Sequence, residues 1–129
     1  MNKIYIETSA GELIDKLTIL EIKKEKIKDQ KNLKIINKEY LSLKKSLDNT
    51  LKINNQINNL WNQLRDINLK LWEIEDAKRL AEKNKNFDEN FIKLSRNVYK
   101  FNDQRAKIKF EINQLCGSDI KEIKQYTEY

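Results

Sequence analysis

Apolar residues recur at every third or fourth position along most of this 129-residue chain, which is the spacing of one face of an α-helix. The clearest series begins at Ile53 and continues to Ala81 in alternating steps of four and three. A second series of the same kind runs from Phe87 to Leu115. Each series is typical of the buried seam of a coiled coil, so each predicts one long helix.

The residues around these two series predict a hairpin. A polar turn at 84–86 separates them, Asp88 is a suitable N-cap for the second helix, and Gly117 is a suitable residue to end it. Because the seams have equal length and the turn is short, we expect antiparallel helices at about 51–84 and 88–115. The prediction is a long coiled-coil-like hairpin over about residues 51–115.

Two shorter helices are predicted before the hairpin. Ser9 and Glu12 have the spacing of a capping box, which indicates that the first helix begins near Ser9. A further apolar series from Leu33 to Leu47 predicts the second helix, which should end at the polar residues 48–50. We expect both helices to pack against the hairpin.

The predicted fold class is therefore all-α, a helical bundle that forms one domain over residues 1–129. The apolar-alternating lead at residues 3–7 could pair as a short strand with the tail at 118–129. A short helix in the tail is the alternative, and the sequence leaves both open.

The composition supports a helical fold and removes several classes of chemistry. Charged residues make up 36% of the chain, there is no proline, and only two glycines are present, so little interrupts a helix. Histidine is absent, which excludes Ser-His-Asp catalysis, Cys-His catalysis and metal sites built on imidazole. We predict neither a metal site nor a cofactor.

Charge and cysteine content bear on partners and compartment. The formal charge of +6 comes from lysines spread between Lys3 and Lys124, so they form no basic patch and we do not expect nucleic-acid binding. The lone Cys116 is typical of a reducing compartment. The N-terminus has no signal-peptide core and no stretch has the length of a membrane span, so we expect a cytoplasmic protein with no membrane partner.

A polar stripe runs beside the seam of the first long helix. In a chain that uses lysine so freely, the arginines and tryptophans are candidates for positions where their geometry matters. If opposing residues of the hairpin sum to roughly 170, opposite charges meet repeatedly across it. The stripe consists of Trp61, Arg65, Asn68, Trp72, Glu75, Arg79 and Glu82, and the expected cross-hairpin pairs are Glu75 with Arg96, Asp66 with Arg105, and Arg65 with Asp103.

These residues predict a polar cleft that binds an anionic or hydroxylated small molecule. Arginines would clamp the anionic group, the aromatic rings would cover an apolar or sugar-like face, and carboxylates would act as acid, base or hydroxyl acceptor. The start of the first helix could add backbone N–H groups and further charges. The predicted binding residues are Trp72, Glu75, Asp76, Arg79, Arg96, Tyr99, Asn102, Asp103 and Arg105, with Glu12, Asp15 and Lys16 from the first helix.

Two other interpretations explain parts of the same pattern. Charges that flank a seam often only fix the register of a coiled coil, and capping alone accounts for Ser9 and Glu12. The chain could also be an interaction protein without enzymatic activity, which uses the hairpin as a surface for self-association or for a larger partner. In that case Trp61, with Ile53 and Ile57, is the expected contact patch.

Several segments together resemble a known family. They are GELIDKLTILEIK, LWEIEDAKR, NFDENFIKLSRNVY and FNDQRAKIKFEIN, and the likeness covers nearly the whole chain. The sequence is similar to short, uncharacterised bacterial and phage proteins described only as a domain of unknown function, family 6165. The resemblance implies a common fold unit and leaves the function open. The chain departs from the family pattern at Ala77, Lys78 and Ser95, and none of the charged candidates is lost.

Overall fold

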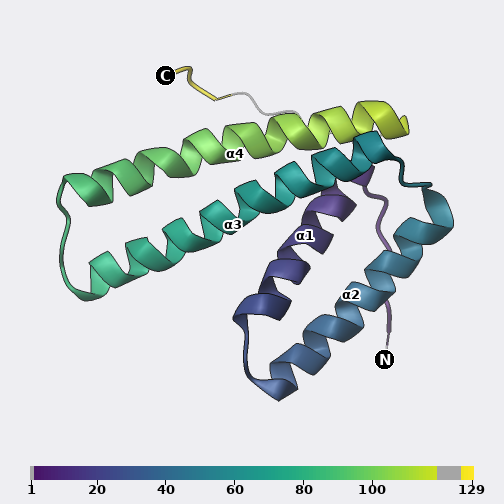
Figure 1. Ribbon diagram of the computed structural model, residues 1–129, viewed down its shortest axis with the longest axis horizontal. Coiled ribbons are helices and arrows are strands. Elements are labelled where there is room, and N and C mark those ends of the chain that lie inside the picture. Colours follow the sequence, from purple (N-terminus) through teal and green to yellow (C-terminus); the bar gives the residue numbers. More distant parts are fainter. Residues whose placement is uncertain (1, 119–125) are drawn as a thin grey trace.

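The computed structural model describes residues 2–118 and 126–129. Within these residues the chain forms no strand, and the all-α bundle expected from the sequence is confirmed. Figure 1 shows two helical hairpins that cross each other. The helices are α1 (Ala10–Lys26), α2 (Gln30–Thr50), α3 (Asn55–Lys83) and α4 (Glu89–Cys116).

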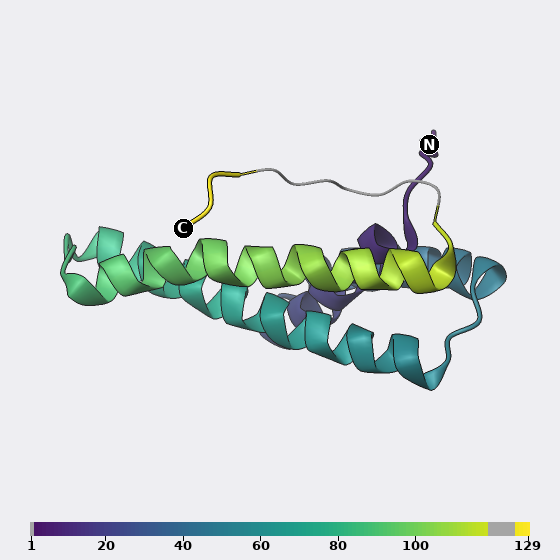
Figure 2. The same cartoon turned by 90° about the horizontal axis from the view of Figure 1, so that it is seen from above.

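The two longest helices, α3 and α4, run antiparallel and side by side, as both views show (Figures 1 and 2). The α3 helix begins later than expected, because the Asn54 side chain accepts a hydrogen bond from the Ile57 N–H and so caps the helix there. At the other end of the hairpin, Lys85 takes a positive φ of 52° in the tight turn. Asp88 then caps α4 by accepting from the Phe91 N–H, as predicted.

The other ends of the helices also follow local signals. Ser9 caps α1 by accepting a hydrogen bond from the Glu12 N–H at 3.2 Å. Gly117 ends α4 in the left-handed region, with φ of 64°, where glycine is favoured because it has no Cβ. The α2 helix ends at Thr50, within the polar segment expected to stop it.

The core lies at one end of the α3–α4 hairpin, where α1 packs across both helices (Figure 1). Its fully buried side chains include Leu17 of α1, Leu47 of α2, Leu64 of α3 and Ile112 of α4. One cluster therefore joins the four described helices around a common core.

The other half of the hairpin, residues 70–103, extends beyond α1 and α2 (Figure 1), and we call it the arm. Ile74 is its one buried residue, whereas Leu80, Phe87 and Ile92 each expose roughly half of their surface. The arm is thus two helices thick, and no third described helix covers Leu80, Phe87 or Ile92.

The strand pair left open between the lead and the tail is absent from the described residues. Residues 3–7 form no strand, and the apolar Ile4, Tyr5 and Ile6 are exposed. Most of the tail, at 119–125, lies outside the described residues, so the alternative of a tail helix concerns a segment the structure does not describe.

Candidate functional site

A buried polar cluster joins α1 to the hairpin. The Asp15 carboxylate, of which 5% is exposed, accepts hydrogen bonds from Arg105 Nε at 2.9 Å and Nη2 at 2.5 Å. It also accepts from the Asn68 amide at 2.8 Å, and the same amide donates to the Thr18 hydroxyl. A buried carboxylate is tolerated when it is paired with charge and hydrogen-bonded in this way. The cluster therefore fixes how α1 sits on α3 and α4.

Close contacts at the start of α1 continue this attachment. The Gly11 N–H donates to the Asn113 amide oxygen at 2.6 Å, and the Ala10 N–H donates to the Ser118 hydroxyl at 3.1 Å. Glu12 turns away from its own helix end and pairs with Lys109 Nζ at 2.7 Å. The first N–H groups of α1 are therefore satisfied by the chain itself, in agreement with capping rather than anion binding at this end.

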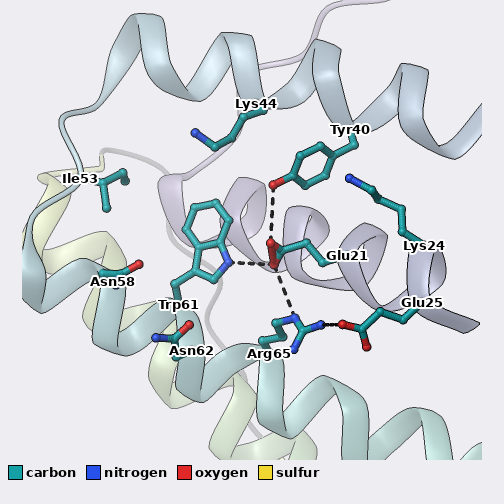
Figure 3. A pocket seen from close by; sticks show the side chains of 10 residues that line it. All are labelled: Glu21, Lys24, Glu25, Tyr40, Lys44, Ile53, Asn58, Trp61, Asn62 and Arg65. Carbon is teal, nitrogen blue, oxygen red and sulfur yellow. Dashed lines mark hydrogen bonds and ion pairs between the residues drawn. The ribbon is translucent and has the colours of Figure 1, made fainter.

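A hollow lies between α1, α2 and the start of α3, and Figure 3 shows its side chains. It has a volume of about 680 Å³, which is within the usual range for small-molecule sites. We call it the α1–α3 cleft. Its lining residues are Glu21, Lys24, Glu25, Tyr40, Lys44, Ile53, Asn58, Trp61, Asn62 and Arg65.

Glu21 stands at the centre of the cleft and faces three donors (Figure 3). The Trp61 indole N–H donates to its Oε1 at 3.0 Å, and the Tyr40 hydroxyl donates to its Oε2 at the long distance of 3.5 Å. Arg65 Nε lies 3.8 Å from Oε1, so this contact is an ion pair without a good hydrogen bond. One carboxylate from α1 thus gathers aromatic and cationic side chains from α2 and α3.

The cationic groups of the cleft have different partners. Arg65 also bridges to Glu25 through Nη2, so it pairs with both Glu21 and Glu25 of α1. Lys24 Nζ lies over the Tyr40 ring at 4.0 Å from its centre, and Lys44 pairs with Asp48 at 2.7 Å. The ammonium groups of Lys24 and Lys44 lie on either side of Tyr40 at the mouth of the cleft (Figure 3).

Burial and the neighbouring carboxylate change the acidity of Tyr40. Partial desolvation raises the pKa of its hydroxyl above the ordinary value, and the negative charge and hydrogen-bond acceptor of Glu21 raise this pKa further. Tyr40 therefore stays a neutral donor to Glu21 over the physiological range.

The structure separates the twelve binding residues predicted from the sequence. Asp15 and Arg105 lie together inside the bundle with Glu12 nearby, whereas Lys16 turns outward and pairs with Glu39 of α2. Glu75 and Arg79 form an exposed ion pair one turn apart on the same helix, at 2.7 Å. The predicted residues therefore do not line one cleft.

The remaining predicted residues lie along the arm. Trp72 is partly buried, whereas Asp76 and Arg96 are exposed, and Arg96 has no ion-pair partner among residues 2–118 and 126–129. Three others line a groove of about 620 Å³ under the end of the tail, where the Tyr99 and Tyr129 rings meet edge to face. Those three are Tyr99, Asn102 and Asp103.

Two of the three ion pairs expected across the hairpin are replaced by pairs with α1, and Glu75, expected to face Arg96, pairs with Arg79 on its own helix. Arg65 contacts Glu21 and Glu25 where Asp103 was expected, and Arg105 contacts Asp15 where Asp66 was expected. The physical reason is that α1 packs over the polar stripe of α3 and supplies closer carboxylates than the opposing helix. The register between α3 and α4 does not specify where α1 packs on them.

Sequence reasoning missed the centre of the α1–α3 cleft. It placed Trp61, with Ile53 and Ile57, in the contact patch expected under the interaction hypothesis. In the structure Trp61 and Ile57 are buried, at 8% and 4% exposed, so they present little surface to a partner. Glu21 carried no signal beyond that of one more charged residue on α1, because only the fold brings it to the Trp61 indole.

Other site types have no support in the described part of the chain. Among residues 2–118 and 126–129, no three histidine, cysteine, aspartate or glutamate side chains are arranged to hold a metal ion. Within the same residues, each helix is either too short or too polar to cross a bilayer.

The comparisons with known proteins agree with the resemblance seen in the sequence. No curated protein and no solved structure is similar enough to match the chain. A family described as "Family of unknown function (DUF6165)" matches residues 4–128, which is nearly the whole chain. We conclude that this protein belongs to the DUF6165 family, whose function is unknown.

Proposed function

We propose that the protein binds a small hydroxylated molecule with an anionic group in the α1–α3 cleft. The observation that carries the proposal is the arrangement around Glu21, where an indole N–H, a phenol and a guanidinium converge on one carboxylate at the wall of a hollow of about 680 Å³. Small-molecule sites combine aromatic walls with a few convergent polar groups in this way.

The aromatic walls favour a ligand with an apolar ring face. The rings of Trp61 and Tyr40 border the cleft from two different helices (Figure 3). Sugar-like rings have apolar faces that pack on such aromatic side chains, and their hydroxyl groups point outward from the ring edge. Glu21, Asn58 and Asn62 supply acceptors and donors for those hydroxyl groups.

The charges at the mouth favour an anionic substituent. Arg65 is occupied by Glu21 and Glu25, so the cationic groups left for a ligand are the ammonium ions of Lys24 and Lys44. Neither is held rigidly, because one lies over a ring and the other has an exposed partner in Asp48. Both can turn toward a phosphate or carboxylate at the mouth.

The proposal is one of binding, and no reaction follows from these residues. Glu21 is the group placed to accept a hydrogen bond from a ligand hydroxyl, since it is the central carboxylate of the cleft. The predicted clamp of Arg79, Arg96 and Arg105 has no part in this site, because those residues lie on the arm or inside the bundle.

A thermal-shift screen tests the proposal with phosphorylated sugars, nucleotides and carboxylic acids. A ligand bound only by the folded chain stabilises it by about 2.7 kcal/mol at one hundred times its dissociation constant, which raises the melting temperature by several degrees. In a Trp72→Phe background, Trp61 is the only tryptophan, so its fluorescence reports binding at the cleft directly.

A matched pair of double variants locates the site. Lys24→Gln with Lys44→Gln should abolish the thermal shift and the fluorescence change. Lys26→Gln with Lys45→Gln makes the same change in net charge on the same helices outside the cleft, and should leave both signals intact. The proposal fails if no compound in the panel raises the melting temperature, or if the two double variants lose the signal equally.

A further inference from the structure

The chain exposes more surface than a compact monomer of its mass would. The accessible surface of the chain is 9777 Å², whereas a compact monomer of this mass has about 7,200 Å². The excess of roughly 2,500 Å² exceeds the 800 Å² or so that each partner buries in a standard interface. Part of it belongs to the exposed lead and tail, and the uncovered arm contributes another part.

One face of the arm continues the surface on which α1 packs. On α3, Asn68 contacts α1, and Trp72, Glu75 and Arg79 follow it at steps of four, three and four, so they lie on the same side of the helix. On α4, Phe91 lies two heptads before Arg105, which also contacts α1. We call Trp72, Glu75, Arg79 and Phe91 the arm face.

We propose that the arm face binds a second copy of this chain, so that two arms pair antiparallel about a two-fold axis. The charges favour a copy of the chain over another partner. Between residues 70 and 103 there are eight basic and seven acidic side chains, although the whole chain carries a formal charge of +6. The arm thus carries charges of both signs that nearly cancel. Two arms can therefore approach each other without the repulsion that acts between the net positive remainders of the two copies.

The order of charges on the arm face is self-complementary. Glu75 and Arg79 are one helical turn apart and exposed by 57% and 77%. In a two-fold interface, residue i of one copy contacts residue j of the other and the reverse holds as well. An axis between these two residues therefore brings each Glu75 to the Arg79 of the other copy, which forms two intermolecular ion pairs.

The same axis brings aromatic residues together. Measured along α3, Trp72 lies about 7 Å from the two-fold axis. In the antiparallel pair, the tip of the other arm lies next to this position. At that tip, the rings of Phe87 and Phe91 meet edge to face at 5.2 Å. Tryptophan is enriched among the residues that dominate binding energy at interfaces, and phenylalanine is enriched in interfaces generally. Half-buried rings of both kinds can lose their remaining exposure when a partner binds.

Two variants test the proposal, one that reverses the charge of Arg79 and one that exchanges the charges of Glu75 and Arg79. Sedimentation velocity on the full chain over a concentration series measures the dimer dissociation constant. The wild type should form a dimer. Arg79→Glu should raise the dimer dissociation constant by about tenfold or more, because it creates two like-charge contacts. The double variant Glu75→Arg with Arg79→Glu restores the complementary order, so its dissociation constant should return to within about threefold of the wild type.

The controls separate this contact from a general effect of charge. Lys38→Glu changes the net charge by the same amount at an exposed position of α2 and should leave the dimer unchanged. Both arm positions are exposed, so circular dichroism should show the same helix content in all variants. A wild type that stays monomeric at about 100 μM, well above most specific interface dissociation constants, overturns the proposal. An equal effect of Arg79→Glu and Lys38→Glu, or a swap that fails to restore the dimer, also overturns it. These outcomes are independent of ligand binding in the α1–α3 cleft.

Discussion

Arg105 holds the Asp15 carboxylate through two hydrogen bonds, of 2.9 and 2.5 Å, although the two residues are 90 positions apart in the chain. The contact ties the first helix to the last one. The carboxylate is more deeply buried than the guanidinium, with 5% against 27% of the side chain exposed. Removing Arg105 and removing Asp15 should therefore change the stability by different amounts. The buried carboxylate depends on the arginine to compensate its charge.

Arg105→Leu should lower the free energy of unfolding by about 3 kcal/mol, because it leaves the buried charge of Asp15 with the neutral Asn68 amide as its remaining side-chain donor of the cluster. Urea denaturation measures the change. Adding Asp15→Asn removes the buried charge and should recover at least half of the loss. A loss below about 1 kcal/mol in the single variant would show that the pair contributes little.

Gly11→Ala should destabilise the protein by about 1 kcal/mol or more, although alanine is normally the better helix former. An added Cβ would lie 2.6 Å from the Lys109 carbonyl oxygen, which belongs to the α4 backbone and cannot turn away. The melting temperature and the urea midpoint measure the effect. The exposed Asn37→Ala on α2 is the control, and it should be neutral or slightly stabilising.

Tyr40→Phe should make the free energy of unfolding fall less at alkaline pH. The pKa of Tyr40 is raised in the folded chain by burial and by Glu21, so above pH 10 the unfolded chain gives up this proton first. The unfolded state then binds fewer protons, and stability falls as pH rises through the folded-state pKa. Urea denaturation between about pH 8 and 11 should show a shallower fall in the variant. Parallel curves for wild type and variant would contradict this linkage.

The Cys116 thiol should react with iodoacetamide at a higher pH in the folded chain than in the unfolded chain. Burial raises the pKa of this thiol, and the thiolate is the form that reacts. Alkylation rates across a pH series, measured in buffer and in denaturing urea, give the two midpoints. The midpoint rather than the absolute rate is diagnostic, because burial also slows access. Identical midpoints would refute the shift.

The sequence by itself determined the four described helices and several of their ends. The seam spacing predicted α3 and α4, and local capping residues such as Ser9, Asp88 and Gly117 marked where helices begin or end. These features depend on residues within one or two turns of each other, so the chain encodes them locally. The family was likewise evident from segments that can be read directly.

Only the tertiary structure decided which polar residues meet. Asp15 binds Arg105, and Glu21 binds Trp61, because α1 crosses the hairpin at a particular place and angle. That angle results from packing buried side chains of four helices into one cluster, which no periodicity within a single helix specifies. From the sequence, Trp72, Glu75 and Arg79 were as good candidates for a site as Arg65 and Trp61, since all five belong to one stripe. The difference is that α1 covers the first half of that stripe and leaves the second half exposed on the arm.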